Sequence, residues 1–229
     1  HLHQYISRGM EAFLSALDIT GSPDQQRVIT ISTTPAMGAL LMPCLASALK
    51  PAFPQILLHN IALTDAARQL DQRQVDLLID THLHSGQALS HHVLYQDRVQ
   101  MYCRAGHPAL DGPQDESALA QYEFALLLPE GQRYPTLHRR LQEEMGERRC
   151  GFSTFNLLTQ AAMIAESDML GLTTERLFAM VSRLWPLQTL DVPSLREEQI
   201  DVALHFNKQS GKEPLLKEII ETVIQAFKA

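Results

Sequence analysis

The stretch that decides the fold of this chain is residues 91–110, His-His-Val-Leu-Tyr-Gln-Asp-Arg-Val-Gln-Met-Tyr-Cys-Arg-Ala-Gly-His-Pro-Ala-Leu. Its apolar residues alternate with mostly polar ones, which predicts a β-strand because successive strand side chains point to opposite faces. The alternating apolar residues are Val93, Tyr95, Val99, Met101 and Cys103. The run ends at Gly106-His107-Pro108, where proline disfavours helical geometry and offers no amide hydrogen, so a turn out of the sheet is expected.

Strands and helices alternate before this stretch, in an order that predicts a parallel sheet. The expected strands are 27–33, 55–61 and 75–79, and the expected helices are 36–49 and 64–74. Thr34 is a suitable cap for the first helix and Pro35 suits its first turn, while Thr64 or Asp65 is expected to cap the second helix.

A second α/β group follows the stretch, and the last thirty residues read as a return to the first group. The expected strands are 124–128, 149–153, 169–172, 186–192 and 200–206, and the expected helices are 115–122, 136–145, 156–165, 174–184 and 214–228. The chain therefore predicts two α/β lobes joined by crossing strands.

Residues 2–18 are expected to form a helix before the first strand. Its apolar residues Ile6, Met10, Phe13 and Leu17 are spaced four, three and four apart, as in the seam of a coiled coil. Two heptads fit a dimerising helix and a short helix packed on its own domain equally well.

Composition limits the classes of function. The chain has 229 residues and a formal charge of −7, so it is not expected to grip a phosphate backbone by itself, which requires clustered Lys and Arg. The cysteines Cys44, Cys103 and Cys150 are odd in number and lack paired spacing, which indicates buried, reduced thiols in a cytoplasmic protein. No apolar run approaches the roughly 20 residues that span a bilayer, and no signal peptide is apparent, so no membrane partner is expected.

Motifs follow one another in a fixed order at residues 28–43, 74–79, 104–110, 170–177 and 205–216. This ordered set resembles the effector-binding domain of LysR-type transcriptional regulators. Gln74-Val-Asp-Leu-Leu-Ile79 resembles that family's Gly-x-(Val/Ile)-Asp-hydrophobic strand, with Gln74 in the usual place of glycine. The most specific segment is Arg104-Ala-Gly-His-Pro-Ala-Leu110. Leu170 to Leu177 resembles a late glycine-containing turn, and His205 to Leu216 resembles the family's ending, from which Phe206 and Asn207 depart.

The resemblance implies an α/β fold of two Rossmann-like lobes, of the type-2 periplasmic-binding-protein kind. Residues 1–22 would be the end of a linker helix, 24–104 with 199–229 regulatory lobe I, and 105–198 regulatory lobe II. It also implies homodimers or homotetramers, and DNA binding only through a winged helix-turn-helix that would precede residue 1. The effector-sensing lobes would control that domain.

The resemblance places a small-molecule effector, anionic or aromatic, in the cleft between the lobes. From the residues alone, Thr33, Thr34 and Pro35 join a strand's carboxyl end to a helix N-terminus, where free amides and the helix dipole favour an anion. The alternative is that Thr34 only caps its helix. By analogy with the family, Thr64, Thr81, Tyr134, Thr136, Ser153, Thr154 and Thr173 line the same cleft.

Neither metal nor cofactor chemistry is expected. His82, His84, His91 and His92 lie close in sequence, but no cysteine or carboxylate completes a four-ligand spacing. His107 is expected to be a turn residue. Nucleophile-elbow and phosphate-binding glycine motifs are absent from the sequence, so we do not expect an enzyme. The main alternative on the same fold is a periplasmic-type solute-binding protein.

Overall fold

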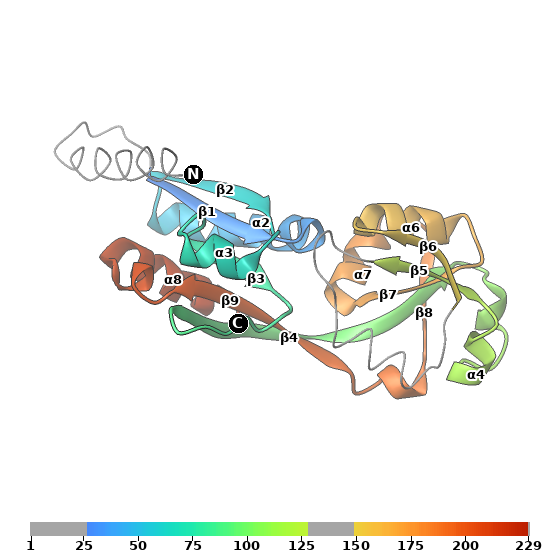
Figure 1. Cartoon of the computed structure of the whole chain (residues 1–229). Coiled ribbons are helices and arrows are strands. Elements are labelled where there is room, and N and C mark those ends of the chain that lie inside the picture. Colours follow the sequence, from blue (N-terminus) through green and yellow to red (C-terminus); the bar gives the residue numbers. More distant parts are fainter. Residues whose placement is uncertain (1–26, 128–148, 229) are drawn as a thin grey trace, which may run out of the picture.

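The computed structural model describes residues 27–127 and 149–228, and the nine strands of this part form one continuous, curled sheet (Figure 1). The strand order is β2-β1-β3-β9-β4-β7-β5-β6, with β8 paired to β4. The sheet divides into two portions that share the 16-residue strand β4 (Leu89–Arg104), here called sheet A and sheet B. The predicted α/β fold with crossing strands is confirmed.

Sheet A is built from the first strands and the returning chain. Its parallel strands are β1 (Arg27–Thr33), β2 (Ile56–Ala62) and β3 (Leu77–Asp80), and β9 (Gln199–Asn207) runs antiparallel between β3 and β4. Its helices are α2 (Pro35–Ala52), α3 (Ala66–Asp71) and α8 (Pro214–Ala226), and the 3-10 turn η4 spans Ser210–Lys212. The buried faces of α2 and α8 pack together over Ile29, Ile31 and Leu204.

Sheet B contains the second group of elements. Its strands are β5 (Glu123–Leu127), β6 (Arg149–Thr154), β7 (Leu170–Thr174) and β8 (Leu187–Leu190), next to the second half of β4. Its helices are α4 (Glu116–Leu119), α6 (Leu157–Ala165) and α7 (Glu175–Val181), with 3-10 turns η2 (Pro108–Leu110) and η3 (Pro193–Leu195). The predicted helix 136–145 and the expected linker helix 1–22 lie outside the described residues.

The segment after β4 explains the most specific sequence motif. Gly106 adopts a left-handed φ of 68°, and the Arg104 guanidinium donates to the carbonyls of Ala105 and Gly106 and to the carboxylate of Asp168. His107 is fully buried; its Nδ1 accepts from the amide of Ala109 at 3.0 Å, which caps η2. The predicted turn is confirmed, and the side chain of His107 holds the start of the 3-10 turn that follows it.

The predicted alternation in β4 is wrong at one point. A register shift between Val93 and Tyr95 turns Leu94 into the core and leaves Val93 38% exposed. A bulge adds one residue to one strand, so the inward and outward positions exchange after it. In sheet B, Val99, Met101 and Cys103 are buried as predicted, but Tyr102 between them is buried too, because helices cover the other face of the sheet there.

The prediction of three buried thiols is also wrong. Cys103 is buried, and burial raises its pKa to about 11. Cys44 and Cys150 are exposed free thiols, because α2 presents Cys44 on the side away from its core and β6 is an edge strand.

Candidate functional site

Four of the predicted threonines belong to one edge of sheet A. Because β1, β2 and β3 are parallel, with Thr33 opposite both Ala62 and Ile79, their carboxyl ends lie side by side. Thr33 and Thr34 therefore share this edge with Thr64, which follows β2, and with Thr81, which follows β3.

Thr33 is held rigidly. Its side chain is 1% exposed, and its Oγ1 accepts a hydrogen bond from Asn60 Nδ2 at 3.0 Å, while the same nitrogen donates to the carbonyl of Ile31. A Cβ at Gly38 would lie 2.8 Å from both Thr33 Oγ1 and Asn60 Oδ1. Gly38 is therefore required for α2 to approach this pair.

Thr34 occupies the N-cap position of α2, but its hydroxyl makes no capping hydrogen bond. The expectation that it caps its helix through its side chain is therefore wrong. Pro35 is exposed at the first helical position and supplies no amide hydrogen. The Thr34 side chain is left available to another group at the helix N-terminus.

Thr64 and Thr81 are less enclosed. Thr64 is exposed, and Asp65 caps α3 by accepting from the amide of Arg68 at 3.0 Å, which decides between the two predicted caps. Thr81 is half-buried, and its amide donates to Asp80 Oδ1 at 2.7 Å.

The other predicted residues belong to sheet B. Ser153 is exposed and Thr154 is half-buried at the end of β6, and Thr154 Oγ1 accepts from the amide of Asn156 at 3.2 Å. Thr173 is 7% exposed at the end of β7, and its Oγ1 has no hydrogen-bond partner among the described residues. Tyr134 and Thr136 lie outside the part of the chain that the structure describes.

Strand pairing fixes how far the carboxyl edge of sheet A, at β3, lies from the carboxyl edge of sheet B, at β7. Asp80 and Val93 both pair with Ala203, whereas Thr174 pairs with Val99. The carboxyl ends of β3 and β7 are thus separated by six residues of β4, or about 20 Å at 3.3 Å per residue. Between them, α2 packs against α6 and α7, and one apolar cluster joins Met37 and Leu41 to Leu177 (Figure 1).

Sequence reasoning missed further polar groups near this crossing. Gln100 pairs with Thr173 across β4 and β7, and its buried Oε1 has no hydrogen-bond partner among the described residues. The same is true of Tyr95 OH and Thr174 Oγ1. A buried polar atom without a partner costs free energy unless a ligand or water satisfies it. The only sequence signal for Gln100 is a polar residue between buried Val99 and Met101.

A cluster of imidazole side chains surrounds the carboxyl end of β9. His205 is fully buried; its Nε2 accepts from the backbone amide of His84 at 3.1 Å, and His84 Nε2 lies 2.7 Å from Asp80 Oδ2. Ring centroids are 5.2 Å apart for His84 and His205, and 5.8 Å for His91 and His205. Burial, together with the neighbouring His84, lowers the pKa of His205 to about 4. Among the described residues, no three such side chains are arranged to hold a metal ion.

The sequence and the fold together define the class of protein. The sequence pattern of the LysR substrate binding domain matches residues 23–228, so the chain belongs to the LysR family and is the effector-sensing domain of a transcriptional regulator. It is 45% identical over 227 residues to an uncharacterized helix-turn-helix transcriptional regulator, YbeF of Escherichia coli strain K12. The matched residues make up 99% of this chain and 72% of that protein.

Solved structures show the same fold. A probable transcriptional regulator from Pseudomonas aeruginosa matches with a TM-score of 0.80 at 17% identity, over 96% of this chain and 74% of that one. The regulatory domain of CrgA, a LysR-type regulator from Neisseria meningitidis, matches with a TM-score of 0.70 at 14% identity, over 89% and 100% of the two chains. The comparisons do not support the solute-binding alternative. No helix in the described part of the chain is long and apolar enough to cross a membrane.

Proposed function

We propose that this domain binds a small-molecule effector between the carboxyl edges of sheets A and B and passes its occupancy to an attached DNA-binding domain. The two sheets would belong to the lobes expected from the sequence, 24–104 with 199–229 and 105–198, and the protein would act in the cytoplasm without enzymatic activity. The observation that carries the proposal is the pair of buried, unpartnered polar atoms Thr173 Oγ1 and Gln100 Oε1 beside the crossing, among described residues.

The polar groups at the carboxyl edges of the two sheets favour a ligand with hydrogen-bonding oxygens. Thr173 offers a hydroxyl donor, Gln100 adds a side-chain amide, and Thr34 stands at the N-terminus of the 18-residue helix α2. The positive end of a helix dipole stabilises negative charge, so a carboxylate is a suitable effector group. The rigid Thr33–Asn60 pair would position this edge before the ligand arrives.

Thr173→Val is expected to lower effector affinity by about tenfold, because it removes a hydroxyl that donates to a charged oxygen and keeps the side-chain shape. The free domain should be as stable as before or more so, since an unpartnered buried oxygen is lost. Thr34→Val is expected to weaken binding to a similar extent. Thr189→Val, an exposed position on β8, is the control.

The effector for this test would be found by thermal-shift screening of small carboxylates and aromatic acids, and titration calorimetry would give the affinities. Unchanged affinity in Thr173→Val and Thr34→Val would refute the assigned site. Weaker binding in Thr189→Val as well would show that the loss is not specific.

We also propose that the domain forms a homodimer through α2. From Pro35 to Leu49 this helix carries no charged residue, and its outer side presents Ala39, Cys44 and Ser47 to solvent. On α6, Leu158 is 43% exposed next to exposed Phe155. The family resemblance implies antiparallel pairing, in which the first helix of one lobe lies beside a helix of the other copy's second lobe. We assign α6 as that helix because of the exposed Leu158. Small, uncharged residues facing large apolar ones suit such a contact.

Leu158→Glu should raise the dimer dissociation constant by at least about tenfold, because a carboxylate would be buried without a partner. Sedimentation velocity across micromolar concentrations measures it. Leu184→Glu is the matched control, since Leu184 is 61% exposed and lies off α2 and α6. A chain that stays monomeric before any substitution would contradict the proposal.

A further inference from the structure

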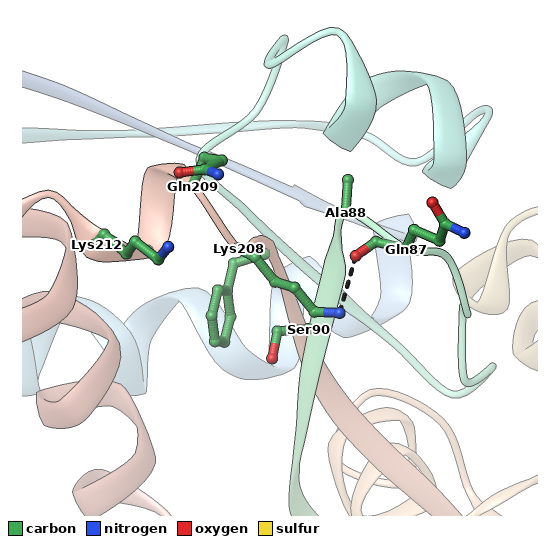
Figure 2. Close-up of a pocket in the computed structure, with 8 residues that line it drawn as sticks. Gln87, Ala88, Ser90, Lys208, Gln209 and Lys212 are labelled. Carbon is green, nitrogen blue, oxygen red and sulfur yellow. Dashed lines mark hydrogen bonds between the residues drawn. The ribbon is translucent and has the colours of Figure 1, made fainter.

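A pocket lies at the β4 edge of sheet A, separated from the Thr33 edge by β3 and β9. Its volume is about 630 Å³, within the range of small-molecule sites. Gln87, Ala88 and Ser90 come from the connection before β4 and from its start, and the facing residues come from the end of β9 and from η4 (Figure 2).

The pocket is open to solvent, and its floor is set by one close contact between η4 and β9. Ser90 and Phe206 are paired across β4 and β9, and a Cβ at Gly211 would come within 2.8 Å of the Phe206 ring. Gly211 therefore brings η4 close to that ring and leaves Phe206 half-buried at the wall of the pocket. A half-buried aromatic face provides a surface for a flat apolar group.

Lys208 is fixed at the opposite strand end by two hydrogen bonds. Its amide donates to the carbonyl of Ala88 at 2.8 Å, and its Nζ donates to the carbonyl of Gln87 at 2.9 Å (Figure 2). An ammonium group has three donors. Two of the Lys208 donors therefore remain after the bond to Gln87 and are available to a ligand.

The charge of the pocket is opposite to that of the chain. Two ammonium groups, those of Lys208 and Lys212, line it, and no carboxylate does, although acidic residues outnumber basic ones 26 to 19. Neither lysine forms an ion pair with a described residue, and the adjacent Glu213 instead pairs with Arg27 at 3.4 Å. Both positive charges are thus left for a ligand.

We propose that this pocket is a second ligand site, separate from the one between the sheets, for a small organic anion that carries a flat apolar group. The anionic end is placed at the Lys212 ammonium group, with the side-chain amide of Gln209 as a further donor. Lys208, which extends toward Gln87, adds its positive charge from the other side of the pocket (Figure 2). The apolar end lies on Phe206. The charge-assisted bonds select the anion, and the ring selects the flat group.

Phenylacetate is the probe, 2-phenylethanol is its neutral analogue, and inorganic phosphate is an anion without a ring. Titration of the isotope-labelled 229-residue chain, followed by NMR, should show saturable shifts of the Gly211 amide and of the Gln209 side-chain amide with phenylacetate. Binding of 2-phenylethanol and of phosphate should be weaker by about tenfold or more.

Lys212→Gln should weaken phenylacetate binding about five- to tenfold. Lys217→Gln removes the same charge from the start of α8, where Lys217 faces Glu221 outside the pocket, and should leave binding unchanged. Equal losses in both variants would overturn the proposal, because they would indicate a general charge effect. Shifts only near Thr33 and Gly171, or no saturation at millimolar phenylacetate, would overturn it as well.

Discussion

Lowering the pH from 6.5 to 4 is expected to remove about 2–3 kcal/mol from the free energy of unfolding through His205 alone. In the unfolded chain this imidazole takes up its proton near the ordinary pKa of 6.5, whereas in the fold it does so only near 4. Between these values the unfolded state binds more protons, so stability falls as the pH falls. Well above pH 6.5, where the ring is neutral in both states, His205 no longer lowers the free energy of unfolding.

The largest cause of the lowered pKa is burial, which favours the neutral ring over the charged one. His205 Nε2 accepts from the amide of His84, so a proton on that nitrogen would break the bond and bring two donors together. His84 and His91 face the ring and oppose a positive charge, and Asp80 opposes them only partly. Water around exposed His91 screens part of the effect, which favours the lower end of the range.

Urea denaturation at pH 7, 6.5, 5 and 4, followed by circular dichroism, measures this dependence. His205→Gln keeps an acceptor and removes the titration, so its stability should change less with pH than that of the natural chain. His59→Gln, at an exposed position on β2, should retain the full dependence. Asp76, whose pKa burial raises, contributes with the opposite sign, so the difference between variants is the quantity to compare. Identical pH profiles for His205→Gln and His59→Gln would refute the prediction.

Gly171→Ala is expected to destabilise the domain by about 1–3 kcal/mol, because its methyl group has no space. The added Cβ would clash with Ile164 Cδ1 and lie 2.8 Å from the Tyr102 ring. That ring is fully buried, and its hydroxyl donates to Gln160 Oε1 at 3.0 Å, so it cannot swing away without losing a buried hydrogen bond. Thermal or urea unfolding measures the loss.

Two further variants test the cause. Gly112→Ala places a methyl group where no atom lies within 4 Å, so its effect should stay within about 0.5 kcal/mol. Ile164→Val deletes the clashing Cδ1, so the double variant with Gly171→Ala should lose less stability than the two single variants together. Strict additivity would show that crowding at Ile164 is not the cause.

The order and type of the elements were largely predictable, because they depend on local patterns. Strand 27–33 matches β1, the strand from 200 to 206 lies within β9, and Asp65 was one of two caps considered. The predicted helices at 36–49 and 156–165 correspond to α2 and α6. Boundaries shifted where tertiary pairing decides them, as at β3, which begins at Leu77 instead of residue 75.

The sequence by itself determined the family, the α/β order and the long strand that leaves the sheet at Gly106, since these depend on residue type, periodicity and turn chemistry. Only the tertiary structure decided which atoms lack partners and which residues are covered. Thr34 lacks its expected capping bond. Thr173 and Gln100 are paired across β7 and β4 and carry buried atoms without partners among the described residues. His205 contacts His84 and His91, which are 114 or more positions away in sequence. Hydrogen bonding and burial depend on neighbours that strand pairing brings from distant parts of the chain, and local patterns carry no record of those neighbours.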